Sequence, residues 1–221
     1  MKCIFTLLFV LCFFNAQAND YYKAKIALVS GETLEGFAQL PSNKLLDNSI
    51  RFKSAKNQKS KKIKNKEIDK ALYITESGNK YLLVRTKTRR ILRSFGKVRE
   101  NIIDKKVWLL LKYHHPKIDF YCHAQSYIIN KQGIMIAKTV DRTGTWADIF
   151  LLLKRPNEVA PTIITSLSYG AKIIGKEKKF RKYSSIYFSD NESFVKRIKN
   201  KEFEHDKMSE LIDAYILLKE S

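Results

Sequence analysis

The stretch "KAKIALVSGETLEGFAQL", residues 23–40, decides the fold class of this chain. Its small and apolar residues recur at every second position, first over residues 24–28 and again over residues 34–40. Alternation with a period of two is typical of a strand that is buried on one face. Ser30-Gly31-Glu32 separates the two runs as a short turn that contains glycine. The stretch therefore predicts a β-hairpin at the start of the folded domain.

Further short strands are predicted on both sides of tight turns. Residues 48–53 form a third strand, and residues 71–75 and 80–86 flank a turn with Gly78 as a second hairpin. Two later hairpins are predicted around the turns at 114–116 and 155–158, each of which contains proline. Short strands joined by tight turns indicate a small, curved sheet or a partial barrel.

The C-terminal quarter changes to a helical period. Phe180, Tyr183 and Tyr187 recur at helical spacing, and residues 189–192 match the S-x-x-E capping box of a second helix. A last helix opens at His205-Asp206 and carries an apolar stripe. We therefore expect an α+β fold with a β-rich part at 19–105, then hairpins and two to three short amphipathic helices at 106–221. No Gly-, Ser- or Pro-rich linker divides these parts, so they are expected to form one continuous unit.

Residues 1–18 have the pattern of a secretory signal peptide. Lys2 precedes an apolar run at 3–14, and Ala16-Gln17-Ala18 matches the small-x-small cleavage pattern. The run is shorter than the roughly 20 residues of a membrane-spanning helix. The alternatives are an uncleaved anchor, a core helix, or a lipoprotein with Cys12 as the lipidated residue. The sequence predicts cleavage near Ala18 and export to the periplasm or the cell surface, with no membrane span afterwards.

Charge and cysteine content restrict the partners. The chain has 42 Lys and Arg against 22 Asp and Glu, a formal net charge of +20. Cleavage leaves Cys122 as the only cysteine, so no internal disulfide is expected and the fold depends on its core. For an exported chain, intracellular nucleic acid is excluded as a partner. The remaining anions are lipid phosphates, acidic polysaccharides and extracellular nucleic acid, and an envelope protein is a further partner to consider.

Two basic stretches contain the candidate anion-binding residues. Residues 53–66, "KSAKNQKSKKIKNK", hold seven lysines, and residues 85–99 hold seven Lys or Arg, both without an acid. The structural alternatives are lysines that protect an exposed strand edge, and a solvated loop that leaves the sheet. Arginine grips phosphate with a planar, bidentate fork, which favours the second stretch. The candidates are Lys59, Lys61, Lys62, Lys64, Arg85, Arg89, Arg90 and Arg93.

Motifs of catalysis and metal binding are not found in the sequence. Cys122-His123, with His114 and His115 nearby, is the one grouping of cysteine and histidine. Consecutive strand residues point to opposite faces, so these two side chains are not expected to converge. The chain has no H-E-x-x-H, G-x-S-x-G or Gly-rich phosphate loop. We expect no catalytic, metal or cofactor site, and Trp108 and Trp146 are expected to be core or interface aromatics.

Two stretches carry a resemblance to a known group. They are "KIALVSGETLEGFAQL" at 25–40 and "YFSDNESFVKRIKNKEF" at 187–203. With the basic connector and the "LLLKRPNE" hairpin between them, the chain resembles secreted proteins of Bacteroidetes bacteria that have no established activity. The resemblance implies export, a β-rich N-terminal part and C-terminal helices.

Three functions remain open at this point. The first is a non-catalytic binding or structural module of the bacterial envelope with a strongly basic surface. The second is a sequence-independent binder of an anionic polymer, such as lipopolysaccharide, acidic polysaccharide or extracellular nucleic acid. The third is a small hydrolase whose site the sequence does not reveal.

Overall fold

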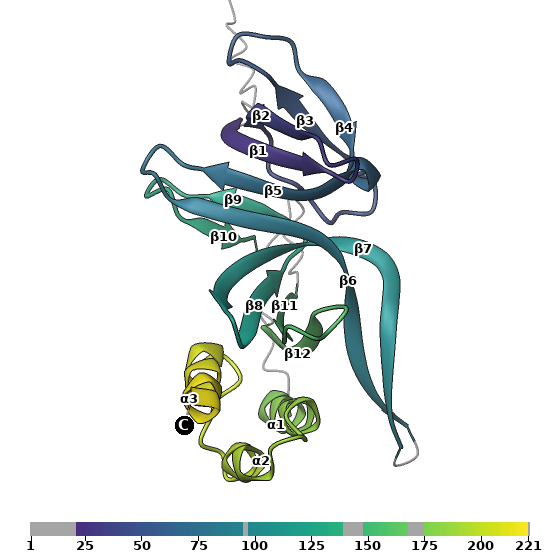
Figure 1. The fold of residues 1–221 in the computed structure, drawn as a ribbon, viewed down its shortest axis with the longest axis vertical. Coiled ribbons are helices and arrows are strands. Elements are labelled where there is room, and N and C mark those ends of the chain that lie inside the picture. The colour runs from purple at the N-terminus through teal and green to yellow at the C-terminus, as the bar shows by residue number, and fades with distance from the viewer. Residues whose placement is uncertain (1–20, 95–96, 139–147, 168–174, 221) are drawn as a thin grey trace, which may run out of the picture.

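The structure is a computed structural model that describes residues 21–94, 97–138, 148–167 and 175–220. Strands come first and helices last (Figure 1), so the predicted α+β class with three short C-terminal helices is confirmed. A 3-10 turn, η1 (Asn65–Glu67), joins β4 to β5. The strands are β1 (Tyr22–Leu28), β2 (Thr33–Ala38), β3 (Ser49–Lys53), β4 (Lys61–Lys64), β5 (Ile68–Ile74), β6 (Lys80–Ser94), β7 (Lys97–His115), β8 (Ile118–His123), β9 (Tyr127–Ile129), β10 (Met135–Ala137), β11 (Ile149–Lys154) and β12 (Thr162–Leu167). The helices are α1 (Lys176–Tyr187), α2 (Glu192–Lys199) and α3 (Met208–Glu220).

The first layer is an antiparallel sheet in the order β4-β3-β2-β1-β5-β6, which we call the upper sheet (Figure 1). The predicted hairpin at residues 23–40 is confirmed as β1 and β2. Gly31 in its turn has a φ of 91°, a left-handed conformation that glycine adopts without strain. Ala24 and Ile26 are buried on one face of β1, as the alternation predicts. The second predicted hairpin is confirmed as β5 and β6.

The long strands β6 and β7 connect the upper sheet to the rest of the molecule. Their register shifts between two pairs, Thr86 with Val107 and Thr88 with Ile103. At this bulge Lys87 of β6 lies opposite three residues of β7, at 104–106. A bulge of this kind bends the strands and changes the direction in which nearby side chains point. The expected boundary between residues 105 and 106 lies inside β7, in this bulge.

A closed ring of strands forms the second layer. The strands run in the order β6-β7-β8-β11-β12, and β12 returns to β6 through a parallel bridge between Thr162 and Arg89. The two later hairpins are thereby confirmed, β7 with β8 and β11 with β12. The expected curved sheet is thus present, and the closed part of it is formed by the middle strands rather than by the N-terminal ones.

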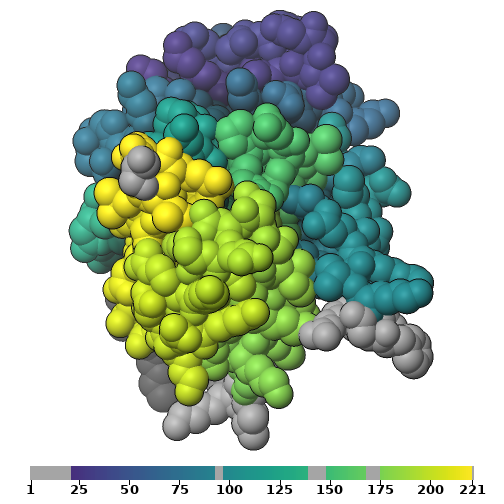
Figure 2. All heavy atoms as spheres, turned by 60° about the horizontal axis from the view of Figure 1, so that its bottom comes forward, coloured from purple at the N-terminus to yellow at the C-terminus, as the bar shows by residue number. Residues whose placement is uncertain are grey.

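The three helices cover the end of the ring opposite the upper sheet (Figure 1). Phe188, which follows α1, packs with ring centroids 5.0 Å from Phe194 of α2 and 4.8 Å from Tyr215 of α3. One continuous cluster of buried apolar side chains extends from the upper sheet through the ring to these helices. Seen from the helical end, the helices form one face, and the arm formed by β6 and β7 stands beside them (Figure 2).

The start of α2 differs from the predicted capping box. The side chain of Asn191, not of Ser189, accepts the capping hydrogen bond from the Phe194 backbone N–H at 2.9 Å. The helix begins at Glu192, so this carboxylate stands at the first helical position, whereas a capping box places it at the third. The predicted position of the N-cap was therefore wrong by two residues, although the predicted helix is present.

No described helix is long and apolar enough to cross a bilayer. The predicted signal peptide lies outside the described residues, as does Trp146. Trp108 is 1% exposed, so the prediction that it belongs to the core is confirmed.

Candidate anion-binding site

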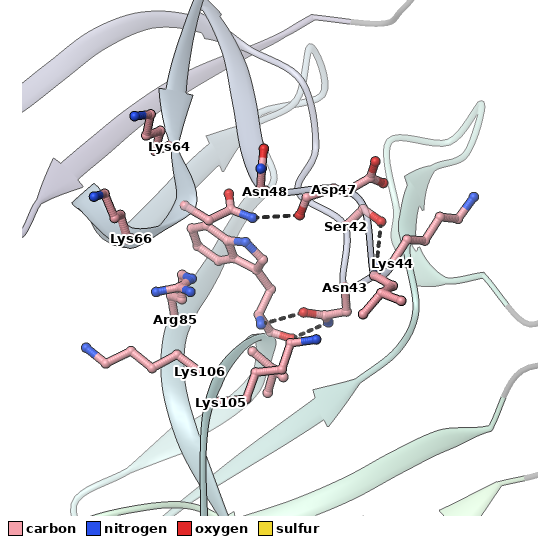
Figure 3. A pocket seen from close by; sticks show the side chains of 14 residues that line it. Ser42, Asn43, Lys44, Asp47, Asn48, Lys64, Lys66, Arg85, Lys105 and Lys106 are labelled. Carbon is pink, nitrogen blue, oxygen red and sulfur yellow. Dashed lines mark hydrogen bonds between the residues drawn. The ribbon is translucent and has the colours of Figure 1, made fainter.

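A pocket of about 270 Å³ lies where the upper sheet meets the ring (Figure 3). Four segments supply its wall: the loop after β2, the end of β4 with η1, the middle of β6, and the bulge of β7. They are distant in sequence, and the order of strands brings them together. The lining residues are Ser42, Asn43, Lys44, Leu45, Asp47, Asn48, Lys64, Asn65, Lys66, Arg85, Lys105, Lys106, Val107 and Trp108.

The wall of this pocket is strongly cationic. It contains six Lys or Arg side chains and one carboxylate, Asp47. Lysines and Arg85 lie along one side, and Asp47 and Lys44 lie on the other (Figure 3). Within the described part of the chain, none of the six cations is ion-paired with a carboxylate. We call these residues the basic pocket: Lys44, Lys64, Lys66, Arg85, Lys105 and Lys106.

Local strand geometry explains how these cations reach the pocket. In β4, Ile63 is buried in the core, so its neighbours Lys62 and Lys64 project from the opposite face. Arg85 of β6 pairs directly with Trp108 of β7. Lys105 and Lys106 belong to the bulge described above, and Val107 separates them from that tryptophan. The irregularity of the β6–β7 pair is therefore what adds two cations to the wall.

Asn43 fixes the loop that closes the pocket. Its side-chain oxygen accepts from the Trp108 backbone N–H at 2.8 Å, and its amide donates to the carbonyls of Trp108 and Ala124 at 2.9 and 2.7 Å. Asn65 holds the other end of the loop, because its side-chain amide donates to the Asp47 carbonyl at 3.0 Å. The loop is thereby fastened to the ring and to η1 at both ends.

Burial affects the chemistry of the pocket at two points. It lowers the pKa of Arg85 from its ordinary value, because the partly buried guanidinium loses hydration. Arginine remains protonated nevertheless. The indole Nε1–H of Trp108 is buried and has no hydrogen-bond partner among the described residues. The guanidinium of Arg85 lines the pocket and is a hydrogen-bond donor, so the wall offers an anion charge as well as directed hydrogen bonds, whereas the Trp108 N–H is enclosed by protein atoms.

Of the eight residues predicted from the sequence, the structure brings two into this pocket, Lys64 and Arg85. Lys59, Lys61 and Lys62 are exposed and lie outside the pocket lining. Lys61 holds its ammonium 5.6 Å from the centre of the Phe52 ring. Lys61, Lys62 and Lys64 belong to β4, the terminal strand of the sheet. The structural alternative, in which lysines protect an exposed strand edge, requires this same position.

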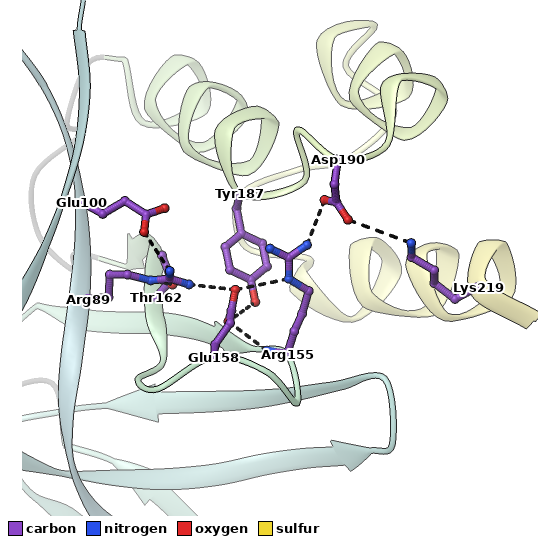
Figure 4. Close-up of polar contacts among 8 residues, drawn as sticks. All are labelled: Arg89, Glu100, Arg155, Glu158, Thr162, Tyr187, Asp190 and Lys219. Atoms are coloured by element: carbon purple, nitrogen blue, oxygen red, sulfur yellow. Dashed lines mark hydrogen bonds and ion pairs between the residues drawn. The ribbon is translucent and has the colours of Figure 1, made fainter.

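Arg89 has a structural role instead (Figure 4). Its guanidinium pairs with Glu100 at 2.8 Å and with Glu158 at 2.7 Å, and it donates to the Thr162 hydroxyl at 2.7 Å. Glu158 is almost fully buried and also accepts from Arg155 and from the Tyr187 hydroxyl. With its donors satisfied in this network, Arg89 holds the ring closed rather than binding a ligand.

Arg90 and Arg93 also lie apart from the basic pocket. Arg90 is exposed and lines a different cavity, of about 380 Å³, next to α1. Arg93 belongs to β6, but its side chain lies outside the described part of the chain.

Four cations of the pocket were missed by sequence reasoning: Lys44, Lys66, Lys105 and Lys106. Lys66 lies inside the first basic stretch, residues 53–66, so its basic character was visible in the sequence. Lys105 and Lys106 come just before the tryptophan of a predicted strand, which is a weak signal by itself. Only the pairing of β6 with β7, and its bulge, places them beside Arg85.

Cysteine and histidine side chains do not assemble into a reactive centre in the described residues. Burial raises the pKa of the Cys122 thiol to about 11, so it is protonated at neutral pH. His114 contacts Asp119 at 2.6 Å, whereas His115 lies 3.6 Å from Glu220. No group of three His, Cys, Asp or Glu residues with metal-binding geometry occurs over the described ranges.

Comparison of the chain with models of protein families, with curated proteins and with solved structures finds no match in any of the three. The chemistry of the basic pocket therefore has to be argued from its own residues.

Proposed function

We propose that this protein is a non-catalytic binding module exported to the bacterial envelope, and that the basic pocket is its site for a phosphate-bearing anion. The observation that carries the proposal is that six Lys and Arg residues from four segments line one cavity without ion-pair partners in the described residues, with Lys44 on the side away from the others (Figure 3). Like charges at close range repel one another, and an anionic ligand relieves that repulsion. Arg89 and Arg155, two other partly buried arginines, are paired with carboxylates, whereas Arg85 is not.

Phosphate suits this pocket better than a carboxylate does. A phosphate group presents several acceptor oxygens, and the wall supplies the fork of Arg85 and several ammonium groups. The pocket is also too small for a polymer, so a polymer would engage it through single anionic groups along its length.

The test is calorimetric titration with phytate, a soluble compound with several phosphates and no lipid chain. We expect Arg85→Gln to weaken phytate binding by about 10- to 100-fold, the loss that is usual for a hydrogen bond to a charged group. The matched control is Arg51→Gln, because Arg51 is exposed on β3, outside the pocket, and its loss changes the net charge equally.

Equal losses in the two variants would contradict the pocket and support the alternative, an anionic-polymer binder that uses its whole basic surface. Heparin then serves as the second probe. Diffuse binding of that kind falls steeply with salt and depends on the number of charges rather than on their position.

A further inference from the structure

Two leucines next to the basic pocket are exposed to solvent. Leu45 is 84% exposed and Leu46 is 88% exposed, whereas most other large apolar side chains of the described residues are buried or partly buried. They occupy the middle of a turn that is closed by a hydrogen bond from the Asp47 backbone N–H to the Lys44 carbonyl at 3.2 Å. Lys44, Leu45 and Asp47 all line the pocket, so the leucines project at its rim.

The loop that carries these leucines is held in place by hydrogen bonds at both of its ends. Asn43 on one side is bound to Trp108 and Ala124, and Asn48 on the other accepts from the Asn65 backbone N–H at 2.7 Å. The Ser42 backbone also bridges to Ser126. The turn therefore holds both apolar side chains away from the core, at a fixed place beside the cations.

We propose that the phosphate bound in the basic pocket belongs to the headgroup of an anionic lipid, and that Leu45 and Leu46 insert into the same membrane surface. This inference rests on the anion site proposed above and adds the source of the phosphate. The combination of a few exposed apolar side chains with surrounding lysines matches a membrane interface, where apolar burial and attraction to anionic lipids act together.

A protein partner fits these observations less well. The centre of a protein interface is depleted in lysine, and a stable interface needs an apolar area much larger than two leucines. The neighbours of Leu45 at the pocket are mainly lysines and polar residues. Charge complementarity thus selects an anionic lipid surface as the occupant.

The experiment measures binding to two kinds of vesicle, phosphatidylcholine alone and phosphatidylcholine mixed with phosphatidylglycerol, by co-sedimentation. Each variant is purified in the form that the cell produces, so that all the proteins compared have the same N-terminus. We expect the protein to bind only the mixed vesicles, and Leu45→Ser with Leu46→Ser to weaken this binding by about 100-fold, roughly tenfold for each leucine. The single variant Leu46→Ser, at a residue outside the pocket lining, should lose vesicle binding about tenfold with phytate binding unchanged, which also shows that it is folded.

The matched control changes two exposed valines elsewhere, Val29→Ser with Val159→Ser, and should leave vesicle binding as it is. Binding of phytate but not of mixed vesicles by the unaltered protein would overturn the lipid inference and leave the anion site standing. Vesicle binding that is insensitive to the leucine changes would also overturn it. Failure to bind phytate would instead reject the anion site itself, and the lipid inference with it.

Discussion

His123 shows how one residue makes the stability of this protein depend on pH. It lies on β8, partly buried, with its ring 5.7 Å from the ring of Phe150. Burial, and to a smaller extent the charge of Arg90, lowers the pKa of His123 to about 4. An unfolded histidine has a pKa of about 6.5. Between these two values the unfolded chain takes up a proton that the folded protein excludes.

A group whose pKa is lower in the folded state contributes its stability at high pH and loses it as the pH falls. We expect the His123 contribution to be complete above a pH of about 6.5 and to decline towards pH 4 by about 2–3 kcal/mol in the free energy of unfolding. Urea denaturation at a series of pH values should show a smaller decline in His123→Gln. Parallel curves for the His123 variant and the unaltered protein would reject this account.

At the scale of elements, β4 is an edge strand that is open to association with other chains. It is the last strand of the upper sheet and pairs only with β3 in the described structure, so its outer backbone groups face solvent. Lysines on such a strand oppose pairing with other molecules by charge repulsion. The edge-protection role and the pocket role are compatible, because Lys61 and Lys62 lie at the edge and Lys64 lines the pocket.

We expect the double variant Lys61→Val with Lys62→Thr to self-associate at protein concentrations at which the unaltered protein is monodisperse. The reason is that the change replaces two edge charges with residues that favour strands. Light scattering over a concentration series is the measurement. The control Lys23→Thr with Lys70→Thr removes the same charge from β1 and β5, which are paired on both sides. If both variants associate alike, then loss of net charge, and not the strand edge, is responsible.

Sequence reasoning predicted elements better than it predicted the site. Hairpins and helices come from local alternation, glycine turns and helical stripes, and these patterns lie within a few neighbouring residues. The pocket combines loop, β4, β6 and β7, and its cations become neighbours only through strand order and a bulge. The sequence therefore indicated Lys64 and Arg85 as basic residues but gave no reason to separate them from Arg89. The carboxylates that pair with Arg89, Glu100 and Glu158, are 11 and 69 positions away in the chain.

At the scale of the whole molecule, Glu158 holds the ring and the helices together. Its carboxylate contacts Arg89 of β6 at 2.7 Å, and the Tyr187 hydroxyl of α1 donates to it at 2.8 Å. Arg155 extends this network to Asp190, between α1 and α2, at 2.8 Å (Figure 4). A single carboxylate thus joins the closing strands to the helical layer.

We expect Glu158→Gln to lower the free energy of unfolding by about 3 kcal/mol, because it leaves partly buried cations without their shared partner. Chemical denaturation followed by circular dichroism measures the loss. Glu35→Gln removes a carboxylate from an exposed pair with Lys25, and it should cost less than about 1 kcal/mol. A loss as small in Glu158→Gln as in Glu35→Gln would show that the network does not stabilise the fold.

The closure of the ring also has a consequence for the order in which the chain folds. Most strands that pair in this molecule are consecutive in sequence, and such pairs form with a small entropic cost of loop closure. The bridge between Arg89 and Thr162 joins residues 73 positions apart, so its formation has to await the later strands. During synthesis β6 therefore emerges well before β12, and until then its far segment is open to incorrect strand partners. This edge of β6 is paired only after the second half of the protein has been made, when β12 closes the ring.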